Sequence, residues 1–529
     1  MNNVYIDPEL VLSANQAQAE ETTDVIIRYS GDISFLNSVY DIFYVELLNQ
    51  FAVARVKTAM IMEIAAYPQI LYIEGTRQLF YEQTLNRQVT ASACMSLEDE
   101  RKGDGVCIAV IDSGVNLTLP IFQDENGESI FVAYWNQRGG FDGNVYGFGS
   151  IYEEEEVENR NLDGNGHGTG VASILATLCP ESFYIGVSVL PNTVAFLCAI
   201  DFAARFAIQR NLPMVFNLSY GNNYGDHQGN TLVENYLDAL SNSGRFCVVT
   251  GTGNDADTGR HKAFFVQGRE SVSFYVSEYL RTFSLQLWSA AFPGYSFQIQ
   301  SPTFHTTPSF STQVFEQSAR MMEASTTIAI QLAKPSPYRP LQEVYILFQN
   351  SEGFIPAGVW TIEFQTMFSQ SIDIQAWLPV YASTSAEVFF LQPTIEATYT
   401  IPSTAKTVMS VGAYDQNLMA MTPFSGCGAK GNFRVPDVVA PGVDIPVLNS
   451  QGGITKVSGT SFATPFASVA AVKLMQWGIV EGHDPFLFGE RLKTIIQAGA
   501  KPLPADKINP NPCSGYGSLC YEASLALLT

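Results

Sequence analysis

The feature that most constrains the fold of this chain is an alternation of apolar strands and helix-like segments, which stops and later resumes. GVCIAVID at 105–112 is a continuous apolar run, the kind of strand that a parallel sheet buries on both faces. Similar runs follow at FYIGVSVL, MVFNLSY and FCVVTG, with helix-like segments such as HGTGVASILATL between them. Strands that alternate with helices predict an α/β domain with a parallel sheet and helices on both faces.

The interruption lies between about His261 and Ile401. Short runs there, such as VSFYV and TFSLQLW, alternate apolar and polar residues and are separated by Pro, Gly and Ser. A period of two over many short runs predicts an antiparallel β-sandwich or jelly roll. The α/β pattern then returns and ends in a long apolar helix that begins at Ser461. The β segment is therefore predicted to be an insertion within the α/β domain.

A smaller unit precedes the α/β domain. VIIRYS alternates like a strand, residues 35–51 have apolar side chains at helical spacing, and the segments up to Phe80 continue as strand, helix and strand. This order, β-α-β-α-β, predicts a ferredoxin-like α+β unit. The following segment, EQTLNRQVTASACM at 82–95, is polar and without pattern, as expected of an exposed linker.

Charge and hydropathy exclude two classes of partner. The formal net charge of −23 gives an acidic surface that repels phosphate backbones, so nucleic acid is not an expected partner. No apolar run approaches the ~20 residues of a membrane span. The N-terminus has no basic segment followed by an apolar stretch, so no secretory signal is predicted. We expect a protein that is made in the cytoplasm and does not insert into membranes.

The cysteines predict neither a zinc site nor a dense disulfide framework. Most of the eight lie in apolar segments such as GVCIAVI and FCVVT, which is typical of buried thiols. No CxxC pair is present. We expect reduced cysteines, with a pair between Cys513 and Cys520 across a Gly-rich loop as the alternative.

Three residues carry a predicted chemistry. Asp112 ends an apolar strand, His167 lies in a Gly-flanked turn that opens a helix, and Ser461 begins another helix. Taken singly, these residues would suit a turn, a helix cap or surface position, and an N-cap. Taken together they supply a nucleophile, a base that removes its proton and a carboxylate that orients the base. The three therefore predict a catalytic triad.

The flanking sequences carry a family resemblance. AVIDSGV, GHGTGVA and SGTSFATP resemble the signature blocks of the subtilase family, and the order Asp, His, Ser is that of subtilisins. The resemblance implies a subtilisin-like serine endopeptidase. It also implies an oxyanion donor at Asn254 in VVTGTGND, for which a turn asparagine is the alternative. The family commonly has a second, structural histidine where this chain has Gly170.

The resemblance carries further implications for binding. FNLSYG resembles the substrate-binding strand, which would pair with an extended peptide; an ordinary buried strand is the alternative. The residues concerned are Ser219, Tyr220 and Gly221. No cofactor is implied. Some subtilases bind calcium, and NLDGN at 161–165 offers oxygen ligands, with a metal-free Asx-rich loop as the alternative.

The layout as a whole resembles the Csp proteases of clostridia and related bacteria. These have a prodomain that stays bound after cleavage and a jelly roll inserted in the protease domain. In spore formers they activate the precursor of a cortex-lytic enzyme during germination, which would associate this chain with spores. The layout also suits relatives of unknown substrate. The predicted division is 1–90 prodomain, 91–260 first part of the protease domain, 261–400 inserted jelly roll and 401–529 second part of the protease domain.

Two alternatives from other classes remain at this point. Some Csp relatives are pseudoproteases that lack triad residues, so a signalling or scaffold protein silenced by its prodomain is one alternative; the complete triad argues against it. A carbohydrate-binding protein that acts through the β insertion is the other, and it rests on fold analogy alone.

The linker leads to a prediction of self-processing. An extended segment between two folded units can enter a cleft that binds extended peptides, so Ser461 would cut the chain in cis. The predicted bond lies between Leu85 and Cys94, near Gln88. The expected partners are a protein or peptide substrate and the protein's own cleaved prodomain.

Overall fold

The structure is a computed structural model, which describes the chain except for residues 1–5, 16–19, 82–99, 314–317, 324, 334, 337–338, 367–368, 385–386 and 430–433. The chain divides into two compact units. The first contains Met1–Arg77, Asn222–Leu232 and Asp257–Ala397, and the second contains Gln78–Gly221, Val233–Ala256 and Thr398–Thr529. The N-terminal part and the inserted β domain, which were predicted as separate domains, thus belong to the same compact unit.

The second unit is built on the predicted parallel sheet. Its central strands are β6 (Cys107–Asp112), β9 (Phe183–Ser188), β10 (Met214–Leu218) and β12 (Phe246–Gly251), which pair in parallel. Nearly all their residues are buried, as expected of strands covered on both faces. The other strands of this sheet are β7 (Phe131–Asn136), β8 (Ser150–Glu153), β24 (Met409–Asp415), β25 (Ala420–Met421) and β26 (Val438–Pro441).

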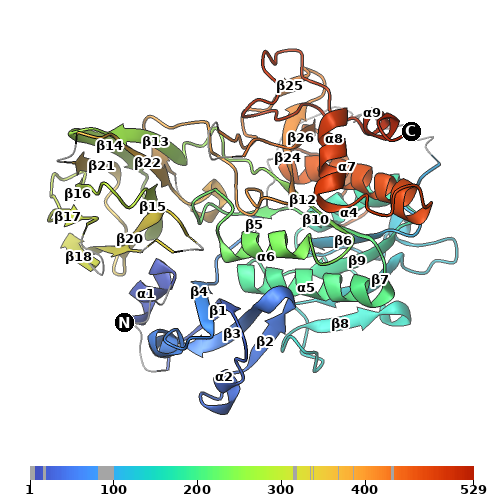
Figure 1. The fold of residues 1–529 in the computed structure, drawn as a ribbon, viewed down its shortest axis with the longest axis horizontal. Coiled ribbons are helices and arrows are strands. Elements are labelled where there is room, and N and C mark those ends of the chain that lie inside the picture. The colour runs from blue at the N-terminus through green and yellow to red at the C-terminus, as the bar shows by residue number, and fades with distance from the viewer. Residues whose placement is uncertain are drawn as a thin grey trace. The chain divides into compact units, whose positions relative to one another are not determined.

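Helices cover both faces of this sheet (Figure 1). Helices α4 (His167–Leu178) and α7 (Thr460–Met475) lie against each other on one face, and α5 (Thr193–Arg210) and α6 (Leu232–Leu240) lie on the other. The apolar core between sheet and helices includes Val110, Val171 and Ala467. The fold class is therefore subtilisin-like α/β, as predicted. The remaining elements of this unit are α8 (Gly489–Gly499), α9 (Tyr521–Ala526), β5 (Phe80–Tyr81), β11 (Tyr220–Gly221), β27 (Ile445–Leu448) and β28 (Ile454–Val457).

The N-terminal part of the first unit is an antiparallel sheet in the order β2-β3-β1-β4 with short helices. Its strands are β1 (Thr22–Tyr29), β2 (Tyr44–Leu47), β3 (Phe51–Lys57) and β4 (Ile70–Gly75), and its helices are α1 (Pro8–Ala14), α2 (Phe35–Ser38) and α3 (Ile61–Ile64). Its core contains Val25, Ile27, Ala54 and Ile64.

The predicted helix over 35–51 is wrong in its second half. Only Phe35–Ser38 is helical, and β2 follows at Tyr44–Leu47. Asp41, three residues after the end of the helix, has φ 52°, a left-handed conformation that a continuing helix would not contain. The YVEL segment buries Val45 and Leu47 and leaves Glu46 exposed. The period of two in YVEL could not be recognised from the sequence, because the apolar residues of this stretch are frequent enough to fit a helical period as well.

Helix α1 was not predicted, although its start is marked in the sequence. Asp7 accepts a hydrogen bond from Glu9 N at 3.2 Å, and Pro8 occupies the first helical position. The helix packs against two strands of the inserted domain: Leu12 forms a buried cluster with Ala329 and Tyr345. The start of the chain is therefore held by the insertion.

A buried cluster of charged side chains also joins the two parts of the first unit. Arg77 pairs with Asp7, and Arg339 of the insertion pairs with Glu343 at 2.8 Å and with Glu74 at 3.4 Å. All five side chains are at least nine-tenths buried. Because a buried charge without a partner is costly, each member holds its neighbours in place.

The insertion is a two-sheet antiparallel sandwich, as predicted; its description as a jelly roll stays a prediction. One sheet has the order β13-β22-β15-β20-β19-β18 and the other β17-β16-β21-β14-β23. Aromatic residues fill the space between them, among them Phe283 and Phe348, whose rings stack at 4.5 Å. The strands are β13 (His261–Val266), β14 (Arg269–Val276), β15 (Thr282–Ser289), β16 (Ser296–Gln300), β17 (Phe310–Ser311), β18 (Ser318–Glu323), β19 (Thr326–Leu332), β20 (Gln342–Asn350), β21 (Gly358–Gln365), β22 (Ile372–Trp377) and β23 (Val388–Phe390).

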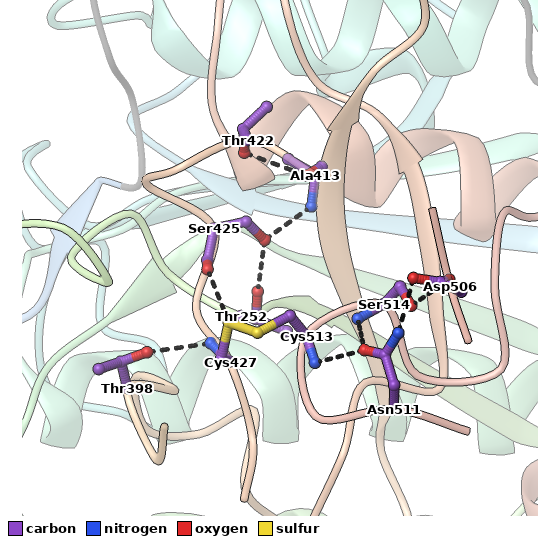
Figure 2. Close-up of a disulfide and its surroundings, with 10 residues drawn as sticks. All are labelled: Thr252, Thr398, Ala413, Thr422, Ser425, Cys427, Asp506, Asn511, Cys513 and Ser514. Carbon is purple, nitrogen blue, oxygen red and sulfur yellow. Dashed lines mark hydrogen bonds between the residues drawn. A yellow bond between two sulfur atoms is a disulfide. The ribbon is translucent and has the colours of Figure 1, made fainter. Parts of the chain in front are cut away.

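The prediction for the cysteines is wrong for part of the set. Cys427 and Cys513 form a disulfide, although 86 positions separate them in the sequence (Figure 2). Cys520 is disulfide-bonded as well, so Cys513 and Cys520 are not partners of each other. The loops of Cys427 and Cys513 meet because Gly428 N donates to Pro512 O at 2.7 Å. The buried cysteines Cys107, Cys179, Cys198 and Cys247 are thiols, as predicted, and Cys94 lies outside the described residues.

No helix in the described part of the chain is both long enough and apolar enough to span a membrane.

Candidate active site

Asp112 and His167 meet at the carboxyl end of β6. Asp112 is the last residue of that strand and His167 is the first of α4. His167 Nδ1 lies 2.7 Å from Asp112 Oδ1, and each side chain is only 1% exposed. Because Nδ1 faces a carboxylate, the imidazole carries its proton on Nδ1 and presents the lone pair of Nε2.

Two glycines allow the start of α4 to approach β6 this closely. Gly166, the N-cap of α4, has φ 90°, a conformation that side chains rarely adopt. A Cβ on Gly168 would lie 2.2 Å from Gly114 O and 3.0 Å from Asp112 Cβ. The GHG sequence is therefore required by the geometry that brings His167 to Asp112.

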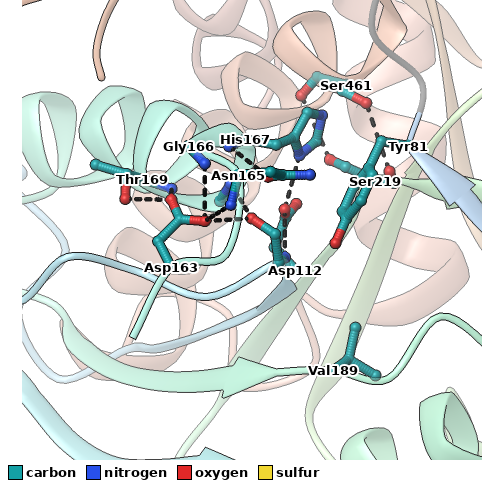
Figure 3. Close-up of polar contacts among 12 residues, drawn as sticks. Tyr81, Asp112, Asp163, Asn165, Gly166, His167, Thr169, Val189, Ser219 and Ser461 are labelled. Atoms are coloured by element: carbon teal, nitrogen blue, oxygen red, sulfur yellow. Dashed lines mark hydrogen bonds and ion pairs between the residues drawn. The ribbon is translucent and has the colours of Figure 1, made fainter. Parts of the chain in front are cut away.

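The Asp163 carboxylate, from the NLDGN loop, braces the same turn. Its Oδ1 accepts from Ser113 Oγ at 2.7 Å and from Gly166 N at 2.9 Å, and its Oδ2 accepts from Thr169 N at 3.0 Å (Figure 3). Donors of the protein itself thus engage both oxygens of this carboxylate, and calcium binding by the NLDGN loop stays a prediction. Across the described ranges, no group of three or more His, Cys, Asp or Glu side chains could hold a metal ion.

Ser461 lies at the start of α7, fully buried, with His167 between it and Asp112 (Figure 3). The helix contains Pro465, which has no N–H, so the Ser461 carbonyl is released from the helical hydrogen-bond ladder. That carbonyl accepts from Ser219 Oγ at 3.4 Å, and Ser461 Oγ donates to Ser219 O at 3.5 Å. The helix start is thereby attached to the strand that precedes Tyr220.

Asn254 lies beside the same helix start. Its Oδ1 accepts from Thr460 N at 3.0 Å and from Thr460 Oγ1 at 3.2 Å. Because a carboxamide group is planar, these two hydrogen bonds to Oδ1 also fix the orientation of Nδ2. Nδ2 is buried and has no hydrogen-bond partner among the described residues. The predicted oxyanion donor thus has a donor group that is oriented and unused.

The predicted substrate-binding strand has a peptide paired with it. Tyr220 and Gly221, which form β11, pair antiparallel with Tyr81 and Phe80, which form β5. On the other side of the same segment, Leu79 N donates to Pro191 O at 2.9 Å, and Leu79 is only 2% exposed. Residues 79–81 therefore adopt the extended conformation of a bound peptide between two segments of the protein.

Tyr81 brings this peptide against the imidazole of His167. Its ring centroid lies 4.8 Å from that of His167 and 4.6 Å from that of Tyr220. Burial raises the pKa of the Tyr81 phenol, and the nearby Asp112 carboxylate raises it further. The phenol is therefore neutral throughout the physiological range.

Of the predicted triad, the structure joins Asp112 to His167 by a hydrogen bond. Ser461 Oγ donates to Ser219 O, and His167 Nε2 has no hydrogen-bond partner among the described residues.

The sequence analysis missed three further residues at this site. Tyr81 lies in a two-residue strand, too short to show any period. Asp163 was considered only as part of the NLDGN loop, whereas its carboxylate accepts from Gly166 N and Thr169 N at the start of α4. Arg138 follows β7 without any motif and donates to Ser113 O at 2.9 Å.

The Asp–His pair, the buried serine at a helix start and the parallel sheet that supports them define a subtilisin-like serine protease. The model of the subtilase family (Peptidase S8) matches residues 103–279 and 377–511, so the chain belongs to this family. The Csp protease B prodomain model matches residues 7–75.

Known proteins are similar over different parts of the chain. The structure of the Clostridium perfringens CspB protease has 25% sequence identity and a TM-score of 0.74, and the match covers 81% of this chain and 94% of that one. The structure of a mutant of the epidermin leader peptide processing serine protease EpiP from Staphylococcus aureus has 16% identity and a TM-score of 0.50, over 96% of this chain and 99% of that one, and shows a shared fold.

A curated relative matches over a short region only. The cell wall-associated protease of Bacillus subtilis (strain 168) is 38% identical over 109 residues. The match covers 20% of this chain and 11% of that relative, so this chain spans about a tenth of its length.

Proposed function

We propose that the protein is a serine endopeptidase that works through an acyl-enzyme on Ser461. As Ser461 Oγ attacks the peptide carbonyl carbon, His167 Nε2 accepts its proton, and Asp112 stabilises the imidazolium. The imidazolium then protonates the leaving amine. Water, deprotonated by His167, attacks the ester and releases the acid, which restores Ser461.

The negative charge of the tetrahedral intermediate requires donors that are already in place. Asn254 Nδ2 is one such donor, because its amide is held by Thr460 and the nitrogen has no other partner among the described residues. The N–H of Ser461, in the first turn of α7, is the second. One such donor stabilises the transition state by roughly 2.7–4 kcal/mol.

The observation that carries this proposal is the pairing of Phe80 and Tyr81 with β11, next to His167. The chain supplies its own peptide to the cleft, so we infer self-processing. Ser219, which hydrogen-bonds to Ser461, comes one residue before Tyr220, the partner of Tyr81. The residue after Tyr81 is then expected to supply the attacked carbonyl, so we propose cleavage between Glu82 and Gln83. Both this bond and the window predicted from the sequence, Leu85 to Cys94 around Gln88, lie outside the described residues.

We propose that the cleaved prodomain remains bound as a partner and inhibitor. Two features support this. Helix α1 packs on the insertion through Leu12, and Arg339 of the insertion pairs with Glu74 of β4. Neither contact involves the bond that is cut, so both are expected to persist after cleavage.

We further propose that the physiological substrate is the precursor of a spore-cortex-lytic enzyme and that the protein is associated with spores. The match to the Csp protease B prodomain and the similarity to the CspB protease structure support this role. Incubation of the purified protein with such a precursor, followed by intact mass measurement, tests it; an uncut precursor contradicts it.

The alternative is a pseudoprotease that acts as a signalling or scaffold protein, with its cleft filled by residues 79–81. A fluorophosphonate probe discriminates the two, because it reacts only with an activated serine. We expect one probe molecule per chain, on the peptide that contains Ser461, and none on Ser461→Ala. Absence of both labelling and self-processing in the folded wild-type protein would favour the pseudoprotease.

A further inference from the structure

The position of Tyr81 in the cleft indicates which peptides the site selects. We propose that the enzyme prefers substrates with tyrosine at P2, the second residue before the cleaved bond, and that Arg138 determines this preference. This inference rests on the proposed protease function and names its substrate class. Residues 79–81 serve as the bound example.

The P2 position is enclosed by aromatic groups. The Tyr81 ring is tilted by about 40° against both His167 and Tyr220, at 4.8 and 4.6 Å between centroids. Tyr220 is completely buried and packs in turn against Phe196 at 6.2 Å. A planar side chain fills this space better than an aliphatic one, because ring pairs at these separations add to the burial of their area.

Arg138 distinguishes a phenol from a plain ring. Its Nη2 donates to Tyr81 Oη at 3.4 Å. Arg138 is solvent-exposed, yet two backbone carbonyls hold its guanidinium: Nη1 donates to Ser113 O at 2.9 Å and Nη2 to Val189 O at 3.2 Å. A charged donor fixed in this way favours a side chain with an acceptor oxygen at the end of a ring.

The space for the guanidinium is provided by a glycine. A Cβ on Gly164 would lie 2.6 Å from Arg138 Nη1. The hydrogen bonds of the guanidinium go to two backbone carbonyls and to the phenol of Tyr81. All three of these acceptors are uncharged.

The test uses self-processing of the full chain, with the P2 residue and Arg138 varied separately. The rate of appearance of the cleaved chain is followed by mass for wild type, Tyr81→Phe, Tyr81→Glu, Arg138→Met and the double variant Tyr81→Phe/Arg138→Met. We expect Tyr81→Phe to be slower by about 3–10-fold, as for loss of one charge-assisted hydrogen bond, and Tyr81→Glu to be slower still. In the Arg138→Met background, tyrosine and phenylalanine should be processed at equal rates. Arg245→Met, which removes an exposed arginine bound to Asn211, serves as the matched control and should retain the wild-type preference.

The outcomes separate this inference from the proposed function. If no variant is processed at all, the protease proposal fails. If processing occurs but phenylalanine or glutamate at P2 equals or exceeds tyrosine, the P2 preference is wrong. If the preference for tyrosine persists in Arg138→Met, then Arg138 has only a structural role through Ser113. The Tyr81 variants leave the cleft itself unchanged. They therefore decide whether the enzyme prefers tyrosine at P2 even if Arg138→Met does not fold.

Discussion

Two sets of buried polar groups, one in each compact unit, differ in how they are partnered. In the first unit, Asp7, Glu74, Arg77, Arg339 and Glu343 are buried and each has an oppositely charged partner. In the second unit, two buried nitrogens at the cleft, His167 Nε2 and Asn254 Nδ2, have no partner among the described residues. Burying a polar atom without a partner costs free energy. The paired set therefore serves to hold the prodomain on the insertion, and the unpaired nitrogens are available for a reacting substrate.

The largest expected effect comes from replacing His167, whose Nε2 has no partner among the described residues, or the nucleophile Ser461. Ser461→Ala and His167→Ala should each reduce peptide hydrolysis to near background, a loss of several orders of magnitude. Because the two act as one unit, the double variant should be little worse than either single variant. Initial rates on a peptide substrate measure this, and a further large loss in the double variant would contradict the shared role.

Removal of the Asn254 side chain, whose Nδ2 is the other nitrogen without a partner, should reduce activity less and should affect kcat alone. Asn254→Ala should lower kcat by roughly 10²–10³ and leave KM nearly unchanged, because the hydrogen bond to the oxyanion forms in the transition state. Steady-state kinetics separate the two parameters. A change in KM alone would place Asn254 in substrate binding instead.

In the paired cluster, removal of one partner should affect stability. Arg339→Met leaves Glu74 and Glu343 buried without their shared cation, which should destabilise the first unit by about 3 kcal/mol. Urea unfolding of the Ser461→Ala background, which keeps the chain intact, measures this. Arg55→Met breaks the exposed pair with Asp24 in the same unit and should cost less than about 1 kcal/mol. If Arg339→Met and Arg55→Met lower the free energy of unfolding equally, burial of the charged cluster does not determine its contribution to stability.

The smallest expected effect is a dependence on pH. Burial raises the pKa of Glu74 and of Glu343 to about 7, against the opposing effect of Arg339. Both values lie above the ordinary range near 4.5, so the folded state binds more protons between about pH 4.5 and pH 7, and stability falls as the pH rises through this window. We expect a loss of about 1 kcal/mol or more between about pH 5.5 and pH 8. Glu74→Gln should flatten the profile; an unchanged slope would exclude Glu74 as its source.

The sequence predicted the parallel sheet and the positions of Asp112 and His167 at adjoining element ends, because both depend on local patterns. Continuous apolar runs mark β6, β10 and β12, and the glycines around His167 are dictated by the close approach of α4 to Asp112. Pairings between distant segments could not be predicted in this way. The disulfide of Cys427, the ion pair of Arg339 with Glu74 and the contact of Tyr81 with His167 all join residues whose spacing carries no pattern. The segment 35–51 of the prodomain shows a different kind of error. Its apolar residues fit both the helical period and the period of two of a strand, so β2 was predicted as helix.

The most direct test of the account is the identity of the first residue of the large fragment. Wild type and Ser461→Ala are produced in parallel and their chain ends are determined by intact mass and N-terminal sequencing. The account predicts that wild type is cut between Glu82 and Gln83, that both fragments elute together from a sizing column, and that Ser461→Ala remains one chain. Cleavage of Ser461→Ala at the same bond, in the absence of another protease, would contradict it.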